Sequence, residues 1–122
     1  MKIADFDKFF TAYLECALWS SNDDNDEPLD ANYGIDDIDE TTKAELAYDC
    51  INFLQLVGYY ITKSGLGVEY AGHNFWLTRN GHGTGFWDRT GHDYHRELAK
   101  VADNFGEVWL YVGDDGMIYS SK

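Results

Sequence analysis

The sequence predicts an α+β fold: a single small domain over residues 1–122, in the order α-α-β-β-α-β-β, with an antiparallel sheet of three to four strands packed by helices. Three observations predict it. Two long segments, 5–20 and 40–63, carry apolar residues at helical spacing. An Asn-Gly pair separates two aromatic segments in the middle of the chain, and two short apolar segments follow residue 106.

The two helices before residue 64 are predicted from their buried stripes, which follow the three- and four-residue spacing of one helix face. The second helix is predicted over residues 40–63, with Asp39 or Thr41 as its cap and Ser64-Gly65 at its end. The predicted core residues are Phe6, Phe9, Phe10, Tyr13, Leu14, Ala17 and Leu18 in the first helix and Leu46, Cys50, Phe53, Leu54, Val57 and Ile61 in the second.

A β-hairpin is predicted over residues 70–89. Aromatic pairs at 75–76 and 86–87 flank Asn-Gly at 80–81, which is a strong hairpin signal because both residues tolerate positive φ. We expect Arg79 and Arg89 to pair with Asp88 beside this turn. The strand tryptophans are expected to be buried; they are Trp76, Trp87 and Trp109.

The last third of the chain predicts a helix and a second hairpin. Asp93 can cap a helix over 94–105, which Gly106 closes. Residues 107–112 have strong β-propensity, and a glycine-rich turn joins them to a return strand at 117–120.

Acidic side chains are concentrated in residues 22–40, which contain no Lys or Arg. We expect an ordered loop rather than a disordered tail, because four apolar residues are spaced as anchors on the core: Leu29, Tyr33, Ile35 and Ile38. The candidate partner-binding residues are Asp23, Asp24, Asp26, Glu27, Asp30, Asp36, Asp37, Asp39 and Glu40. No register of the loop fits the ligand pattern of an EF-hand calcium site.

Net charge narrows the class of partner. The chain carries 22 acidic and 9 basic side chains, a formal charge of −13, and residues 1–62 hold 14 of the acids but 3 of the bases. Such a field repels nucleic acid and attracts basic surfaces. No apolar run has the length of a membrane span, and we expect no membrane association. Cys16 and Cys50 lie in helical apolar patterns and are expected to be free thiols.

The clustering of histidines indicates an alternative function, a metal site. The four histidines are His73, His82, His92 and His95, all within 23 residues of one another, and His92 and His95 are spaced to reach one ion. The order strand, strand, helix around them is similar to that of the ββα-metal nucleases. The residues diagnostic of those enzymes are absent, and a charge of −13 opposes a nucleic-acid substrate. We therefore expect no metal, no cofactor and no catalytic residue.

Two segments carry a resemblance to known proteins. They are His-Asn-Phe-Trp-Leu-Thr-Arg-Asn-Gly-His-Gly-Thr-Gly-Phe-Trp-Asp-Arg at 73–89 and Tyr-Val-Gly-Asp-Asp-Gly-Met-Ile-Tyr at 111–119. Together with Glu-Pro-Leu-Asp-Ala-Asn-Tyr at 27–33, they make the chain similar to a group of small acidic proteins encoded by bacteriophages and prophages. The resemblance implies a phage origin and no particular reaction.

These observations favour a phage-encoded acidic interaction protein in the host bacterial cytoplasm. We expect it to act as a DNA-mimic-like inhibitor of a basic, nucleic-acid-binding or defence protein of the restriction or CRISPR type. Two alternatives stay open. One is a small metal-dependent enzyme built on the four histidines, and the other is a phage accessory protein that forms a homodimer through its aromatic hairpin.

Overall fold

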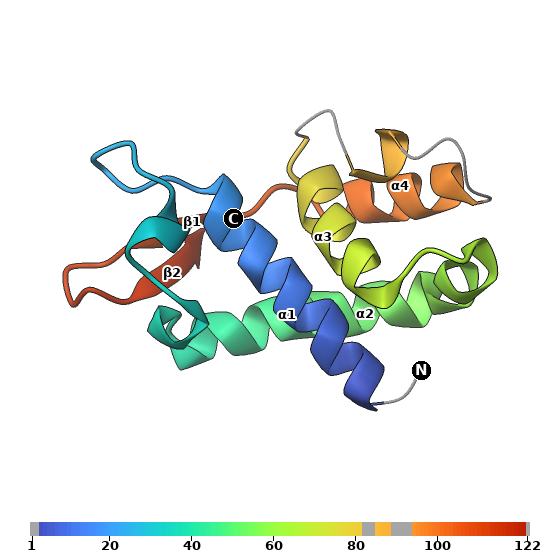
Figure 1. The fold of residues 1–122 in the computed structure, drawn as a ribbon, viewed down its shortest axis with the longest axis horizontal. Helices are drawn as coiled ribbons and strands as arrows, with labels where there is room; N and C mark the ends of the chain where they lie inside the picture. The colour runs from blue at the N-terminus through green and yellow to red at the C-terminus, as the bar shows by residue number, and fades with distance from the viewer. Residues whose placement is uncertain (1–2, 82–84, 89–93, 122) are drawn as a thin grey trace.

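The computed structural model of the chain describes residues 3–81, 85–88 and 94–121, and these residues are mainly helical (Figure 1). The α-helices are α1 (Ile3–Ser20), α2 (Glu40–Ser64), α3 (Val68–Arg79) and α4 (His95–Asn104). The strands are β1 (Trp109–Val112) and β2 (Ile118–Ser121), and short 3-10 helices cover Leu29–Ala31 (η1), Ile35–Asp37 (η2) and Gly85–Asp88 (η3). The predicted sheet of three to four strands is wrong: in the described residues, β1 and β2 form a two-stranded antiparallel sheet.

The helices form the body of the molecule, and the β-hairpin lies at one end of it (Figure 1). Helix α1 crosses α2 and packs mainly against α3. The core between them is aromatic: the rings of Phe53 and Phe75 stack with their centroids 4.0 Å apart, and Tyr13 meets Trp76 edge-on at 5.3 Å. The approach of α1 to α3 requires Gly72, because a Cβ atom there would lie 2.1 Å from the carbonyl oxygen of Phe9.

The two long helices are confirmed. Asp39 caps α2 by accepting hydrogen bonds from the backbone N–H groups of Thr41 (3.1 Å) and Thr42 (3.2 Å). Gly65 ends it in the left-handed conformation, with φ of 75°. The stripe predicted for α2 is buried at Leu46, Cys50, Phe53, Val57 and Ile61, while Leu54 is partly buried.

The predicted hairpin at 70–89 is wrong, because its first half is helix α3. The Asn-Gly pair ends this helix instead of turning between two strands: Asn80 is the C-cap, and Gly81 has a φ of 66°. Residues 74–79 are buried on every side. A helix covered all round has no amphipathic period, so its apolar pattern resembles that of a buried strand.

The second half of that segment also differs from the prediction. Phe86 and Trp87 lie in η3, where Phe86 is buried and Trp87 is 42% exposed. The predicted burial is confirmed for Trp76 but is wrong for Trp109, which is 54% exposed on β1. The predicted ion pair between Arg79 and Asp88 is wrong, because Arg79 pairs with Asp49. Arg89, the other predicted partner, lies outside the described residues.

The last third of the chain follows the prediction closely. Helix α4 lies within the expected range, with Gly106 following it at φ of 77°. Its N-cap is Tyr94, and the predicted cap Asp93 lies outside the described residues. The predicted strands are confirmed as β1 and β2, paired in register from Trp109 with Ser121 to Val112 with Ile118.

The acidic segment is an ordered loop, as predicted. Leu29 and Ile38 are fully buried, and Tyr33 and Ile35 pack partly buried against the same core. Ile38 forms a parallel bridge with Ile118, and the backbone N–H of Asp39 donates to the Ile118 carbonyl at 2.9 Å. The loop is therefore held on the β-hairpin as well as on the helices.

Within the part of the chain that the structure describes, none of the helices combines the length and the apolar character needed to cross a membrane.

Candidate interaction surface

The nine carboxylates of the acidic loop divide into two groups, and three of them are structural. Asp23 accepts the backbone N–H groups of Asn25 (2.9 Å) and Glu27 (3.0 Å). Asp37 accepts that of Gly34 at 2.8 Å, and Asp39 caps α2. Side chains that satisfy loop N–H groups shape the loop, so these three carboxylates serve the fold of the loop.

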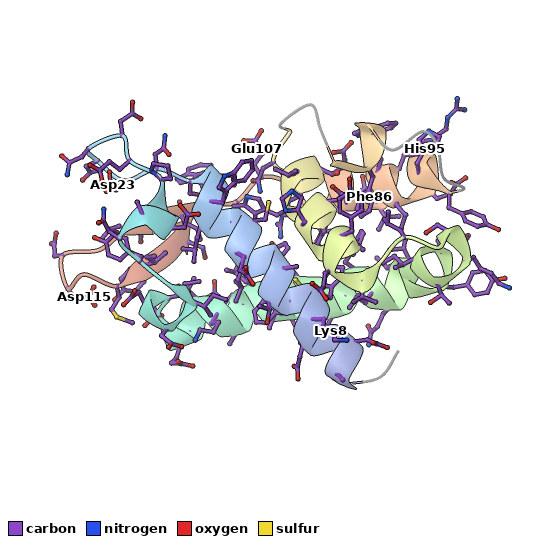
Figure 2. The ribbon with its side chains drawn as sticks, viewed as in Figure 1. Lys8, Asp23, Phe86, His95, Glu107 and Asp115 are labelled. Carbon is purple, nitrogen blue, oxygen red and sulfur yellow. The ribbon has the colours of Figure 1, made fainter. Side chains whose placement is uncertain are left out.

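The remaining six carboxylates point their charge outward. Asp26 and Glu27 accept side-chain amides of the same loop, from Asn22 (3.2 Å) and Asn32 (3.0 Å) respectively. Glu40 pairs with Lys43 at 3.4 Å. Among the described residues, no hydrogen bond reaches the exposed carboxylates of the other three, Asp24, Asp30 and Asp36. Figure 2 shows Asp23, and with it this loop, at the end of the long axis opposite His95.

A groove of about 440 Å³ joins the loop to the helices. It is lined by the loop residue Asp30, by Glu15 and Trp19 of α1, and by Glu69 and Tyr70 at the start of α3. The three carboxylates are exposed, and the aromatic side chains are exposed too, Trp19 by 57% and Tyr70 by 42%. We call this feature the acidic groove.

A second hollow of about 280 Å³ continues the acidic groove along α1. It shares Ala12, Glu15 and Glu69 with the groove and adds Asp7 and Lys8. Lys8 is the one lysine or arginine among the residues that line the two hollows, against four acidic residues. The combined surface is therefore acidic over its whole length.

Carboxylates beside exposed aromatic rings suit a cationic group. A guanidinium or ammonium group gains from the carboxylates by charge and from the ring faces by cation–π attraction. The ring of Trp19 lies 6.1 Å from the ring of His73, which also lines the groove. These aromatic side chains supply the flat faces on which a guanidinium stacks.

The acidic groove also contains a cysteine, and its chemistry is unfavourable for catalysis. Cys16 lies at the groove with 2% of its surface exposed. Burial raises the pKa of its thiol from 9.0 to about 12. Because the thiolate is the nucleophile, a thiol held protonated at neutral pH does not supply nucleophilic catalysis beside His73.

A buried ion pair is the main feature that the sequence did not predict. Arg79, which is 2% exposed, donates to the Asp49 carboxylate (2.9 Å) and to the Tyr13 hydroxyl (3.0 Å). It also donates to the carbonyls of Gly106 (2.9 Å) and Phe105 (3.2 Å). Burial alone lowers the pKa of Arg79, but Tyr13 and Asp49 raise it above its ordinary value. The group joins four segments of the core and serves the fold.

One signal for this pair was present in the sequence. Asp49 lies beside Cys50 on the apolar stripe of the second predicted helix, where an acidic side chain needs a buried partner. The identity of that partner is a long-range feature and could not be derived from spacing.

Two of the four predicted metal-ligand candidates are described. His73 lines the acidic groove on α3, and His95 is the first residue of α4. His82 and His92 lie outside the described residues. Among the described residues, no three His, Cys, Asp or Glu side chains are grouped as a metal site.

Comparison with protein-family models, with curated protein sequences and with solved structures gives no match. The likeness to phage proteins therefore stays a prediction.

Proposed function

We propose that this protein is a non-enzymatic interaction protein that binds a basic surface of a partner protein through the acidic groove and the outward carboxylates of the loop. One observation supports the proposal above the others. Glu15, Asp30 and Glu69, from three separate segments, line one groove together with the exposed rings of Trp19 and Tyr70. Charge alone is common on soluble proteins, but charge combined with aromatic faces in a groove fits Arg and Lys side chains.

The partner class follows from charge. A net charge of −13 disfavours direct contact with nucleic acid and favours the basic surface of a nucleic-acid-binding protein. We propose that the protein occupies such a surface in place of DNA or RNA, in a bacterial cytoplasm, as an inhibitor of a host nucleic-acid-binding or defence protein. The observation behind this step is the charge of the loop and groove.

A fluorescent arginine-rich peptide tests the groove directly. The variant Glu15→Gln, Asp30→Asn, Glu69→Gln removes three groove charges, and we expect it to weaken peptide binding by about tenfold or more. The matched control, Glu97→Gln, Glu107→Gln, Asp114→Asn, removes three exposed charges outside the groove. Fluorescence anisotropy at several salt concentrations measures both. If the two triple variants weakened peptide binding equally, the groove would contribute only through the overall negative charge of the protein and would not be a specific binding site.

Stacking is tested separately from charge. Trp19→Leu keeps an apolar side chain and every carboxylate, yet removes the ring face, and we expect several-fold weaker binding of the arginine-rich peptide. The affinity for a lysine-rich peptide of equal charge should fall less on the same substitution, because a guanidinium group stacks on an aromatic ring better than an ammonium group does. If Trp19→Leu bound both peptides as tightly as the parent does, the proposal that the Trp19 ring contributes to binding would be wrong.

Mimicry of nucleic acid is tested by competition. Proteins captured from a bacterial lysate by the parent chain, and lost with the triple groove variant, should be released by added duplex DNA. The protein itself should show no affinity for that duplex. Direct DNA binding, or capture that DNA does not reverse, would exclude mimicry while leaving peptide binding at the groove intact.

A further inference from the structure

Helix α2 has an outward face that is apolar and almost uncharged. Its four large exposed side chains are Tyr48 (66%), Ile51 (43%), Leu56 (64%) and Tyr59 (66%). Their spacing, with Gln55 between, places them on the side of α2 opposite the buried stripe. Single exposed apolar residues are common, but a row of them along one helix marks a contact surface.

Charge distinguishes this face from the rest of the chain. From residue 44 to residue 63 of α2, the exposed charged side chains are Glu45 and Lys63, one of each sign. Asp49, the other charged residue in this range, is buried and paired with Arg79. A partner with the same charge of −13 is repelled elsewhere by long-range forces, but it meets little repulsion at this face.

The order of side chains along α2 is self-complementary about a point between Phe53 and Leu54. Tyr48 precedes Phe53 by as many residues as Tyr59 follows Leu54, and Ile51 and Leu56 are related in the same way. Glu45 and Lys63 fall within one residue of equivalent positions and lie on the same edge of the face. A two-fold axis through that point matches each side chain with its counterpart, which is the requirement of an isologous interface.

We infer that α2 is a homodimer interface, in which a second copy of this chain packs its own α2 antiparallel on the outward face. In this arrangement Tyr48 of one copy lies opposite Tyr59 of the other, and this contact occurs twice. Glu45 of one copy is within reach of Lys63 of the other, again twice. The occupant is a second copy because the two-fold axis pairs tyrosine with tyrosine, isoleucine with leucine and Glu45 with Lys63. This interface does not depend on the acidic groove, which is formed by α1, α3 and the loop.

Analytical ultracentrifugation tests dimerisation over a range of concentrations. We expect the parent chain to pass from monomer to dimer as its concentration rises. Tyr48→Lys should raise the dissociation constant by about tenfold or more, because it replaces the ring at each of the two Tyr48–Tyr59 contacts with a charge that the interface would bury. Tyr48 is exposed, so the thermal midpoint of the dilute variant should match that of the parent. Trp109→Lys, at an exposed aromatic on β1, is the matched control and should leave the dimer unchanged.

Charge exchange tests the orientation. Glu45→Lys alone and Lys63→Glu alone each bring like charges together in an antiparallel pair and should weaken the dimer. The double variant restores both opposite-charge contacts and should recover the parent's dissociation constant. In a parallel pair each residue would face its own counterpart, and no such recovery would occur.

Cross-linking tests the register. The variants Tyr48→Cys and Tyr59→Cys, mixed and treated with a short thiol-specific linker, should give a covalent dimer that contains one chain of each kind. Either variant alone should give little, because its two introduced cysteines lie about 16 Å apart along the helix axis in the antiparallel arrangement. The native Cys16 and Cys50 are buried and do not compete. A parent chain that stays monomeric, a dimer insensitive to Tyr48→Lys, or self-linking of the single variants would each overturn the inference.

Discussion

Arg79 and Asp49 form a buried ion pair with a 2.9 Å contact between the Nη1 and Oδ2 atoms, and it links α3 to α2. The guanidinium side chain has no exposed surface, and 11% of the Asp49 side chain is accessible. The guanidinium also lies 5.6 Å from the centroid of the Phe75 ring and 5.7 Å from that of Phe105. An arginine in such surroundings depends on its carboxylate, since a buried charge without a counter-charge is strongly unfavourable.

The first prediction concerns this pair. Asp49→Ala leaves the Arg79 guanidinium buried without its carboxylate, and we expect a loss of about 3–5 kcal/mol in the free energy of unfolding. Tyr13→Phe removes one hydrogen bond of the same guanidinium and keeps the charge pair, so it should cost about 1 kcal/mol. Urea denaturation measures both. A loss for Asp49→Ala no larger than that for Tyr13→Phe would show that the charge pair contributes little.

The second prediction compares two tryptophans. Trp76 is 2% exposed and donates its indole N–H to the Ser20 hydroxyl at 2.8 Å, whereas Trp109 is 54% exposed. Trp76→Ala should cost about 3–5 kcal/mol, because it empties a large volume in the core. Trp109→Ala should cost less than about 1 kcal/mol. The idea that α3 is the core helix fails if the two thermal midpoints fall by equal amounts.

The third prediction concerns the contact between α1 and α3. Gly72→Ala places a Cβ atom against the backbone of Phe9, where neither helix can yield by changing a rotamer, and we expect a loss of roughly 1–3 kcal/mol or more. Gly67→Ala is the control, because a Cβ atom there has no neighbour within 4 Å. Chemical denaturation of the two variants should therefore separate them clearly; similar stabilities would mean that the helices lie farther apart.

The fourth prediction concerns Asn74, which is fully buried on α3. Neither polar atom of its side chain has a hydrogen-bond partner in the described structure. Asn74→Leu replaces this unsatisfied amide by an apolar side chain of the same branched shape, so stability should hold or rise by about 1–2 kcal/mol. Thr78→Val, one turn later, should instead lose about 1 kcal/mol, because the Thr78 hydroxyl accepts the Phe86 N–H at 2.9 Å. Differential scanning calorimetry would refute the first part by showing that Asn74→Leu destabilises the protein.

The fifth prediction concerns alkaline pH. Burial raises the pKa of Cys16 from 9.0 to about 12, and burial also raises the pKa values of Cys50 and Tyr13. The folded state therefore keeps protons that the unfolded state releases. This contribution to stability is complete below about pH 9 and is lost as the pH rises toward about 12.

Urea denaturation at several pH values over this range measures the slope of stability against pH. Cys16→Ala removes one of the three titrating groups, so its stability should decline less steeply than that of the parent. A parent stability that does not change with pH above about 9 would contradict the burial of these groups.

Some elements were predictable from local patterns, and others were not. Helices α1 and α2 each have one buried and one exposed side, so their period is visible in the sequence. Helix α3 is buried around most of its circumference, and its Asn80-Gly81 end has the same sequence signature as a hairpin turn. The local pattern could not distinguish the two structures, because the difference lies in what covers α3.

The candidate surface shows the same limit. The nine acids of the loop were found from composition alone, but Glu15 and Glu69 are 54 residues apart in the sequence and line one groove only because α1 packs on α3. Nor could composition separate Asp23, whose carboxylate organises the loop, from Asp24, whose carboxylate is exposed. Both distinctions depend on tertiary contacts.

The bridge between Ile38 and Ile118 has a consequence for the timing of folding. The loop and the strand that holds it are 80 residues apart in the chain. During vectorial synthesis the earlier partner emerges from the ribosome long before the later one, and contacts of such high separation form slowly. The loop therefore reaches its final shape only after residue 118 has been made. The nascent chain accordingly carries the acidic segment in an unfinished form while α1 and α2 are already available to pack.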